Sequence, residues 1–354
     1  MLSAADDVPP TMRAIVTTGD GHVELKRIDT PRCRSGEALV KVIAVAQNPT
    51  DWKTAVSCKA RGNVLGCDFA GLIVELGPDV PSGLRTIGQR VAGLTHGGIG
   101  PNGAFAEYVT VPAALTIVLP DRTSFEDAAQ IPVACFTTCQ ALYQCLHLPT
   151  PLGGEHEEES VLIWSGSSAT GYYAVQFAKL AGLHVITTSS PRNFKLMKDI
   201  GADEVYDYAP SHTPRRIFAS TDGKLKHAMD CISQDRTPNQ VSTALSKDGG
   251  TIATLLPYVS RTKGVRTEFI LSYSIFGKAI TVPFVYPAKR DHYDNAVKYA
   301  ALISEVLHKH EVKPIPSKLF PHGLESVKDG FEYMQAGKVH GEKVTYRIAD
   351  TPEL

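Results

Sequence analysis

The sequence predicts an α/β protein in which a β-rich, barrel-like domain is joined to a doubly wound parallel sheet. Between residues 12 and 120, short alternating or β-branched runs are separated by Gly, Pro and Asp, a pattern typical of strands. From residue 161 onward, strand-like runs alternate with helix-like stretches, as they do when helices link parallel strands. A chain of 354 residues is long enough for both domains.

The first half of the chain is expected to be mainly β-structure. Strands are predicted at residues 14–18, 22–28, 37–48, 71–77, 90–94 and 106–112. Residues 124–147 have a helical pattern, and Ser124 followed by Asp127 is a typical helix N-cap pair. The segment 149–160 is rich in Pro, Gly and acidic residues and is predicted to be a loop.

The second half is expected to alternate between strands and helices. Strands are predicted at 161–166, 184–190, 203–208, 226–232 and 249–256, and helices at 174–182, 193–201, 214–222 and 237–247. The residues 341–348 near the end of the chain have the pattern of one more strand. We find no internal repeat.

Composition and charge exclude several classes of function. The formal net charge of -1 provides no global field for nucleic acid or an anionic membrane surface. The 7 Cys residues are odd in number and lack a repeated C-x-x-C spacing, so we expect reduced thiols rather than a disulfide framework. The N-terminal residues resemble no signal peptide, and no run reaches the ~20 apolar residues that cross a bilayer. These observations predict a cytoplasmic protein that binds neither nucleic acid nor membrane.

The segment 163–173, IWSGSSATGYY, joins a predicted strand to a predicted helix. Such a turn points the first free N–H groups of the helix at an anion, which is how dinucleotide pyrophosphates are bound. Gly166 and Gly171 remain where glycine is needed, and hydroxyl groups stand where other glycines are expected. The candidate cofactor contacts are Ser167, Ser168, Ala169 and Thr170. The alternative is an ordinary strand-to-helix turn.

The end of the next strand bears on the choice of cofactor. A site for NAD carries Asp or Glu about twenty residues after the loop, where it binds the ribose hydroxyls. Here the strand is followed by Ser190, Pro191, Arg192 and Asn193, with Lys195 close behind. Hydroxyl and cationic groups suit a 2′-phosphate, so NADPH is the expected cofactor. The alternative is a solvated helix start.

Further motifs give the chain a resemblance to a known family. VAQNPTDWK (45–53), NVLGCDFAGLIVELG (63–77) and NGAFAEYVTVP (102–112) resemble segments of zinc-independent medium-chain dehydrogenase/reductases of the quinone oxidoreductase type. The resemblance covers nearly the whole chain. It implies a GroES-like domain over residues 1–130 and 310–354 and a Rossmann-type NADPH-binding domain over 131–309.

A narrower resemblance concerns the substrate. The residues SSAT (167–170), SSPRNF (189–194), YSIFG (273–277) and HGEKV (340–344) are most similar to trans-acting enoyl reductases that serve fungal polyketide synthases. This resemblance implies reduction, with NADPH, of the α,β-unsaturated thioester of a carrier-bound polyketide intermediate in secondary metabolism. The implied partner is a polyketide synthase, or a hybrid of a synthase with a peptide synthetase, and its acyl carrier domain.

No metal is expected. Zinc-dependent relatives keep a Cys and a G-H-E segment for the catalytic ion and four closely spaced Cys for a structural ion. The corresponding stretches here are NPTDWK and LGCDFAG, and the cysteines lack the spacing of tetrahedral ligands. The acidic loop around His156 is interpreted as a solvated linker rather than a cation site.

The resemblance also implies roles for individual residues. Asn48, Pro49, Thr50 and Asp51 are expected beside the nicotinamide, with further cofactor contacts at Tyr208, Leu255, Leu256, Val339 and His340. Lys53 is the candidate catalytic residue, as proton donor or electrostatic support for the enolate; the alternative is an ordinary surface lysine. For Tyr208 the alternative is a core position.

Two segments are expected to line the substrate pocket. The first contains Val133, Ala134, Cys135, Phe136, Thr137, Thr138, Cys139 and Gln140, and the second contains Ser274, Ile275, Phe276, Gly277 and Lys278. Cys135 and Cys139 lie one helical turn apart without an activating base, so we interpret them as packing residues.

Alternatives remain for function and assembly. The fold is also compatible with an NADPH:quinone or small-enone oxidoreductase, or with a non-catalytic NADPH-binding protein. In dimeric relatives an edge strand near 270–282 pairs across a two-fold axis, whereas here Pro283, Pro287 and charged residues follow it. Proline and charge oppose strand pairing, so a monomer is expected; the alternative is that the prolines lie beyond the pairing strand.

Overall fold

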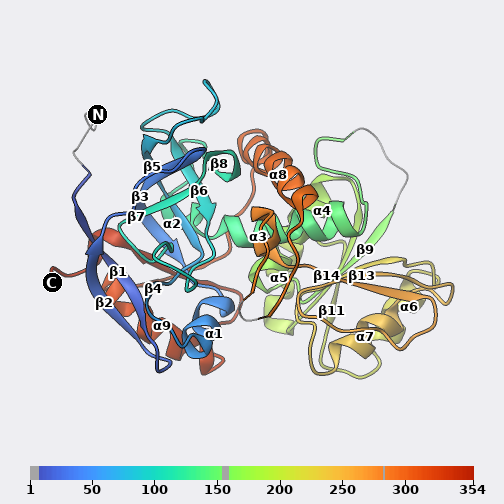
Figure 1. Ribbon diagram of the computed structural model, residues 1–354. Helices are drawn as coiled ribbons and strands as arrows, with labels where there is room; N and C mark the ends of the chain where they lie inside the picture. The colour runs from blue at the N-terminus through green and yellow to red at the C-terminus, as the bar shows by residue number, and fades with distance from the viewer. Residues whose placement is uncertain (1–7, 154–158, 282–283) are drawn as a thin grey trace. The chain divides into compact units, whose positions relative to one another are not determined.

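The computed structural model describes residues 8–153, 159–281 and 284–354, and it divides into two compact units (Figure 1). Unit 1 comprises Met1–Val133 and Tyr273–Leu354, and unit 2 comprises Ala134–Ser272. The sequence placed the second boundary at residue 310. The observed division differs in residues 273–309, which belong to unit 1 and include helix α8 (Arg290–Lys309). Among the described helices, none is both long and apolar enough to span a membrane.

Unit 1 contains two sheets. Strands β2 (Val23–Asp29), β1 (Thr11–Thr18) and β4 (Arg61–Val64) form a small antiparallel sheet in that order. The larger sheet has the order β15-β16-β3-β5-β6-β8, and β7 pairs with β3. Its strands are β15 (Ser317–Phe320), β16 (Lys343–Arg347), β3 (Glu37–Ala46), β5 (Asp68–Leu76), β6 (Arg90–Leu94), β8 (Ile117–Val118) and β7 (Tyr108–Pro112). The expected strands are confirmed, but in the described residues they form open sheets and no closed barrel.

Tyr346, in the core of unit 1, fixes the start of helix α1 (Pro49–Ser57). In helix α9 (Val327–Gln335), Gly330 has no side chain, and a Cβ there would lie 1.7 Å from the Tyr346 hydroxyl. This space lets Tyr346 donate a hydrogen bond to Gln47 Oε1 at 2.5 Å, while Gln47 Nε2 donates to the Gly330 carbonyl at 2.9 Å. Gln47 precedes the N-cap Asn48, so the core holds the first turn of α1 in place.

Unit 2 is a six-stranded sheet with the order β11-β10-β9-β12-β13-β14, and every neighbouring pair is parallel. The strands are β9 (Ser160–Trp164), β10 (His184–Ser189), β11 (Glu204–Asp207), β12 (His227–Asp230), β13 (Gly250–Thr254) and β14 (Val265–Phe269). Helices α4 (Ala169–Leu180), α5 (Phe194–Asp199), α6 (Thr213–Ser220) and α7 (Thr237–Ala244) connect them. The expected doubly wound sheet is confirmed, and its order reverses between β9 and β12, where such sheets bind ligands at their carboxyl ends.

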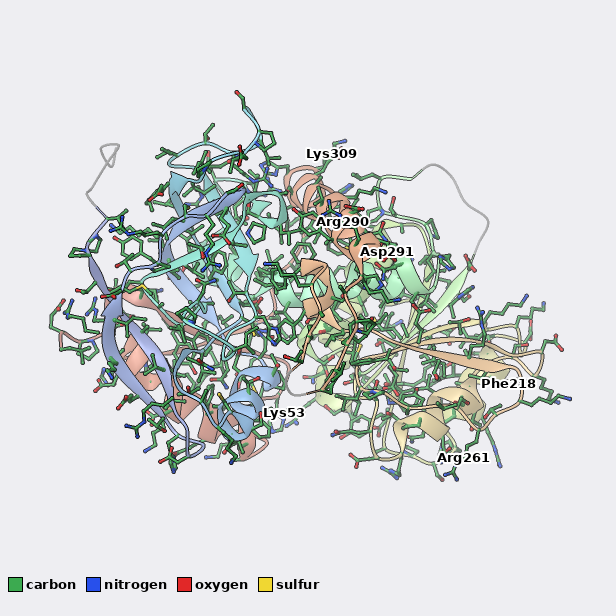
Figure 2. The ribbon with its side chains drawn as sticks, in the orientation of Figure 1. Lys53, Phe218, Arg261, Arg290, Asp291 and Lys309 are labelled. Atoms are coloured by element: carbon green, nitrogen blue, oxygen red, sulfur yellow. The ribbon has the colours of Figure 1, made fainter. Side chains whose placement is uncertain are left out.

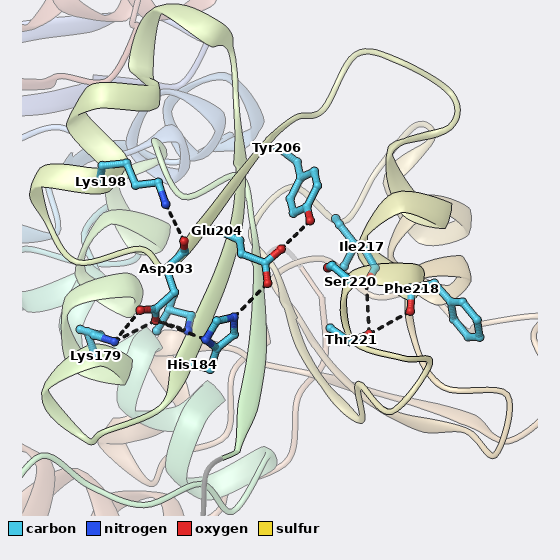
Figure 3. A network of polar contacts seen from close by, with 11 residues as sticks. Lys179, His184, Lys198, Asp203, Glu204, Tyr206, Ile217, Phe218, Ser220 and Thr221 are labelled. Carbon is cyan, nitrogen blue, oxygen red and sulfur yellow. Dashed lines mark hydrogen bonds and ion pairs between the residues drawn. The ribbon is translucent and has the colours of Figure 1, made fainter.

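Polar contacts join the opposite, amino ends of these strands (Figure 3). His184 at the start of β10 contacts Glu204 at the start of β11, with 2.9 Å between Nε2 and Oε1. Lys179 of α4 forms an ion pair with Asp203 at 2.7 Å. Because this network lies at the end of the sheet away from the switch point, we interpret it as structural.

Helical structure begins at Ser124, as the sequence predicts. Ser124 caps α2 (Phe125–Ala128), and its hydroxyl accepts a hydrogen bond from the Asp127 N–H at 3.1 Å. Helix α3 (Ile131–Cys139) follows and continues into a π-helical turn, η2 (Gln140–Cys145).

The expected edge strand at 270–282 is wrong. Residues Ser272–Phe276 form a 3₁₀ helix, η4, and the described residues between η4 and α8 make only the isolated bridge between Ile280 and Tyr286. Tyr273, Ser274 and Ile275 are buried within this 3₁₀ turn. The edge of the sheet is β14 instead. Pro283 lies outside the described residues, and Pro287 follows the bridge.

Candidate functional site

The loop between β9 and α4 has the close packing that a dinucleotide loop needs. A Cβ on Gly166 would lie 2.2 Å from Thr187 Oγ1, and a Cβ on Gly171 would lie 2.4 Å from the Ser165 carbonyl oxygen. Ser165 itself has a φ of 70°, an unusual conformation for a residue with a side chain. The two glycines therefore stand where only glycine fits.

The hydroxyl groups of this loop have different surroundings. Ser168 Oγ accepts a hydrogen bond from the Gly171 N–H at 3.2 Å and donates one to the Ser165 carbonyl at 2.8 Å. It is the N-cap of α4, so its hydroxyl proton is already used to close the loop. Ser167 and Thr170 are half-buried. The loop and the first turn of α4 contain no carboxylate, which fits an anionic group at this helix start.

The end of β10 carries the residues expected to select the cofactor. Ser189 is buried, and residues Pro191–Asn193 form a short 3₁₀ turn, η3. Arg192 is exposed. Lys195 forms an ion pair with Asp199 at 2.6 Å, but its side chain is 86% exposed, and such a pair is weak in water. Both cations can therefore turn to an anionic ligand at little cost.

A buried carboxylate that the sequence reading missed organises the end of β12. Asp230 accepts hydrogen bonds from the Ser233 N–H at 2.8 Å and the Thr237 hydroxyl at 2.8 Å. Ser233 Oγ in turn accepts the Leu255 N–H at 2.8 Å, so this network fixes the loop after β13. Leu256 is partly exposed, and the 46% exposure of Tyr208 excludes a core position for its ring.

In unit 1, a second buried polar network lies at the start of α1. The side-chain amide of Asn48 donates to Asp68 Oδ2 at 2.8 Å, and Lys343 Nζ donates to Asn48 Oδ1 at 2.5 Å. Lys343 also forms an ion pair with Asp68 at 3.5 Å, and the exposed fractions of the two side chains are 3% and 0%. The N–H of Val133 donates to Asp68 Oδ1 at 2.7 Å. This network joins α1, β5, β16 and the segment before unit 2.

Asp51 shares this buried region and has no cation of its own. Its Oδ2 accepts the Asn48 N–H at 2.6 Å. Burial, with a smaller contribution from the nearby Asp68 charge, raises the pKa of Asp51 to about 7, although the Cys67 thiol, the Asn48 N–H and the Lys343 charge act to lower it. Because the single Lys343 ammonium pairs with Asp68, Asp51 is the carboxyl that keeps a proton.

A thiol and a phenol extend this region. The Tyr273 hydroxyl lies 2.9 Å from Cys67 Sγ and 2.9 Å from Thr50 Oγ1. Its ring stacks on His96, with 3.8 Å between ring centroids and 13° between planes. Burial lowers the pKa of His96 to about 4, so this imidazole is neutral at pH 7.

The sequence reading assigned no role to most of this network: Cys67, Asp68, His96, Tyr273 and Lys343. LGCDFAG, YSIFG and HGEKV were recognised only as family landmarks. For LGCDFAG and YSIFG, the one available signal was a polar Asp or Tyr among apolar residues and glycine.

The other predicted residues of unit 1 lie on or near its surface. Lys53 on α1 is exposed, and its Nζ lies 5.7 Å from the centre of the Trp52 ring (Figure 2). Pro49 and His340 are exposed, while Val339 is half-buried. Thr50 is half-buried and three residues before Lys53, so the two side chains share one face of the helix.

The residues predicted to line a substrate pocket differ in burial. Ser274 is buried and forms a hydrogen bond to His292 Nδ1 at 2.7 Å; Ile275 is also buried, Phe276 and Gly277 are half-buried, and Lys278 is exposed. Val133 is half-buried, and residues 134–140 are buried. Cys139 is fully buried, and burial raises the pKa of its thiol. A neutral, enclosed thiol fits the packing role. Within the described ranges, no group of three or more His, Cys, Asp or Glu side chains could hold a metal ion.

Comparisons with known proteins agree with this architecture. Residues 34–121 match the alcohol dehydrogenase GroES-like domain, and residues 169–278 match the zinc-binding dehydrogenase domain. The crystal structure of CurK enoyl reductase has a TM-score of 0.78 at 18% identity, covering 96% of this chain and 99% of that chain. Mycobacterial Rv1454c complexed with NADPH has a TM-score of 0.72 at 22% identity, covering 95% and 99%. At these identities the likeness shows the fold alone.

The GroES-like unit and the parallel-sheet unit define a medium-chain dehydrogenase/reductase, a class of oxidoreductases. Sequence similarity is more specific. The trans-enoyl reductase ACTTS2 of Alternaria alternata is 38% identical over 343 residues, which cover 96% of this chain and 99% of that protein. The trans-enoyl reductase traG of Penicillium crustosum is 34% identical over 365 residues, covering 98% and 100%. The chain therefore belongs to the family of trans-enoyl reductases.

The proton held by Asp51 predicts a pH-dependent stability. In the unfolded chain Asp51 ionises near pH 4, whereas the folded protein keeps it protonated up to about pH 7. Stability should therefore fall as pH rises through this window, by at most about 4 kcal/mol for this group. In urea unfolding at these pH values, the free energy of unfolding of Asp51→Asn should fall less with rising pH than that of the unaltered protein, because Asp51 no longer contributes. The exposed Asp121→Asn is the matched control, and a decline in Asp51→Asn equal to that of the unaltered protein would contradict the assignment.

Proposed function

We propose that the protein reduces the α,β-unsaturated thioester of a carrier-bound polyketide intermediate, with NADPH as the hydride source. The observation that carries this proposal is full-length similarity to trans-enoyl reductases at 34–38% identity. The partner would be a polyketide synthase or a synthase–peptide synthetase hybrid, presenting the substrate on its acyl carrier domain.

The residues of this chain fit the tasks that such a reaction sets. NADPH supplies the hydride when bound, and the protein must hold the cofactor and stabilise the enolate that forms at the thioester oxygen. The start of α4, with Ser167 and Thr170, suits the pyrophosphate, and Arg192 suits the 2′-phosphate. Lys53 is an exposed ammonium on the same face of α1 as Thr50, which suits a donor to the enolate.

The reaction is tested by following NADPH oxidation with enoyl thioesters, carrier-bound and free, beside simple quinones and small enones. We expect carrier-bound thioesters to be preferred. Lys53→Ala should lower turnover on the order of 100-fold without changing NADPH affinity, because it removes a proton donor or enolate partner. Lys59→Ala, also exposed and just after α1, is the control. A preference for quinones would favour the oxidoreductase alternative, and no turnover with any substrate would favour a binding protein.

The choice of NADPH over NADH rests on Arg192. Removing a charged hydrogen-bond partner of a phosphate costs about 1.5–3 kcal/mol, so Arg192→Ala should weaken NADPH binding roughly 10- to 150-fold. NADH has no 2′-phosphate, so its affinity should not change. Arg215→Ala, exposed on α6, is the control, and fluorescence titration measures both affinities. Equal binding of the two cofactors by the unaltered protein would contradict this proposal.

We propose that the protein acts as a monomer. The edge strand β14 directs Arg266 and Glu268 outward, and charged side chains on an edge oppose pairing with a second copy. Light scattering at micromolar concentration should give the mass of one chain, 38.2 kDa. Twice that mass would contradict the proposal.

A further inference from the structure

Four polar side chains lie in succession inside unit 1. The first is the buried Asp51 carboxyl, which lies close enough to the Cys67 thiol for each group to shift the pKa of the other, and whose Oδ1 has no hydrogen-bond partner among the described residues. Cys67 Sγ lies 2.9 Å from the Tyr273 hydroxyl, and that hydroxyl lies 2.9 Å from Thr50 Oγ1. Asp51, Cys67 and Tyr273 are buried, whereas Thr50 is half-buried. The chain therefore leads from the interior toward the surface of α1.

The charges around Asp51 favour a protonated carboxyl. The ionisable groups that face it are Asp68 at the start of β5 and Cys67 just before it, Lys343 and Tyr346 on β16, and Tyr273 on η4. Of these only Lys343 is a cation, and it is paired with Asp68 at 3.5 Å. A second carboxylate would be buried without compensation, which costs more than holding a proton.

The two middle members can pass a proton in either direction. Burial raises the pKa of the Cys67 thiol and of the Tyr273 phenol well above their usual values, so both groups stay neutral at pH 7. A neutral thiol or phenol has one hydrogen to donate and lone pairs to accept another. The stacked His96 ring holds the Tyr273 ring in place without competing for its hydroxyl.

The outer end of the chain opens on the face that bears the predicted catalytic lysine. Thr50 and Lys53 lie three residues apart on α1 and share one face of the helix. Of these four residues, only Thr50 is partly exposed to solvent. A proton that reaches its hydroxyl is thus available on this face of α1.

We propose that Cys67 and Tyr273 relay a proton from Asp51 to Thr50, which delivers it to the enolate produced by hydride transfer. This inference rests on the proposed enoyl reduction. The O–H bond of Thr50 breaks as the α-carbon gains a proton; Thr50 regains one from Tyr273, Tyr273 from Cys67, and Cys67 from Asp51. One proton leaves the Asp51 carboxyl, one reaches the product, and every hydrogen bond in the chain reverses its direction. Solvent restores the proton on Asp51 after the product leaves.

The first test needs neither substrate nor cofactor. Infrared difference spectra should show a protonated-carboxyl band that disappears as pH rises through about 7 and is missing in Asp51→Asn. Tyr273→Phe and Cys67→Ser should keep the band, because both keep the burial of Asp51. A titrating band that is unchanged in Asp51→Asn, or no band at all, would overturn the proposal.

The second test follows turnover with an enoyl thioester. Tyr273→Phe keeps the ring that stacks on His96 and removes only the hydroxyl, so turnover should fall on the order of 100-fold with KM nearly unchanged. Its solvent deuterium isotope effect should increase, because proton delivery becomes limiting. Cys67→Ala should behave alike, and Cys67→Ser should recover most of the turnover because a hydroxyl also donates and accepts.

The matched control is Tyr333→Phe, a phenol of the same unit that donates to Glu342 at 2.8 Å. The relay would be overturned if Tyr273→Phe and Cys67→Ala had the same turnover and isotope effects as this control. Retention of the Asp51 band shows that each variant has kept the fold of the network. If the unaltered protein reduced no thioester, the proposed function would be contradicted. The substrate-free spectra test the proton on Asp51 independently, so the two failures can be told apart.

Discussion

The ion pair between Lys343 and Asp68 is the interaction on which unit 1 depends. Both side chains are almost completely buried, so each charge is tolerable only because the other is 3.5 Å away. Asn48 is hydrogen-bonded to both partners and is also the N-cap of α1. The helix that carries Thr50 and Lys53 is therefore positioned by a compensated charge in the interior, in addition to apolar packing.

In unit 2, hydrogen bonds at the ends of the strands, rather than a buried ion pair, hold the loops in place. Its inner parallel strands are largely buried, and polar side chains at their carboxyl ends hold the following loops by local hydrogen bonds. Ser168 caps α4, and Asp230 gathers the loops after β12 and β13 through Ser233. Neutral and singly charged hydrogen bonds suffice here because these groups lie at the end of the sheet.

The sequence predicted the elements better than the contacts between them. Periodicity predicted most strands of both units and the helices that connect the parallel strands, but it missed β4, β14, β15, α1, α8 and α9. Gly166 and Gly171 were identified from the strand–loop–helix motif, which depends on neighbouring residues. The segment 270–282 was misread, since its β-branched and aromatic residues are also compatible with a buried 3₁₀ turn. The pairing of Lys343 with Asn48 and Asp68 could not be predicted, because periodicity carries no information on contacts so distant in the chain.

The position of β16 at the far end of the chain bears on biosynthesis. Lys343 lies 295 residues after Asn48, and its strand completes the sheet that contains β3 and β5. Until Lys343 has been synthesised, Asp68 has no counter-ion and the sheet lacks β16. Unit 2 is continuous in sequence and emerges whole before this point. The order of synthesis therefore favours a nascent chain whose parallel-sheet unit folds first and whose N-terminal strands complete their sheet only when β16 is available.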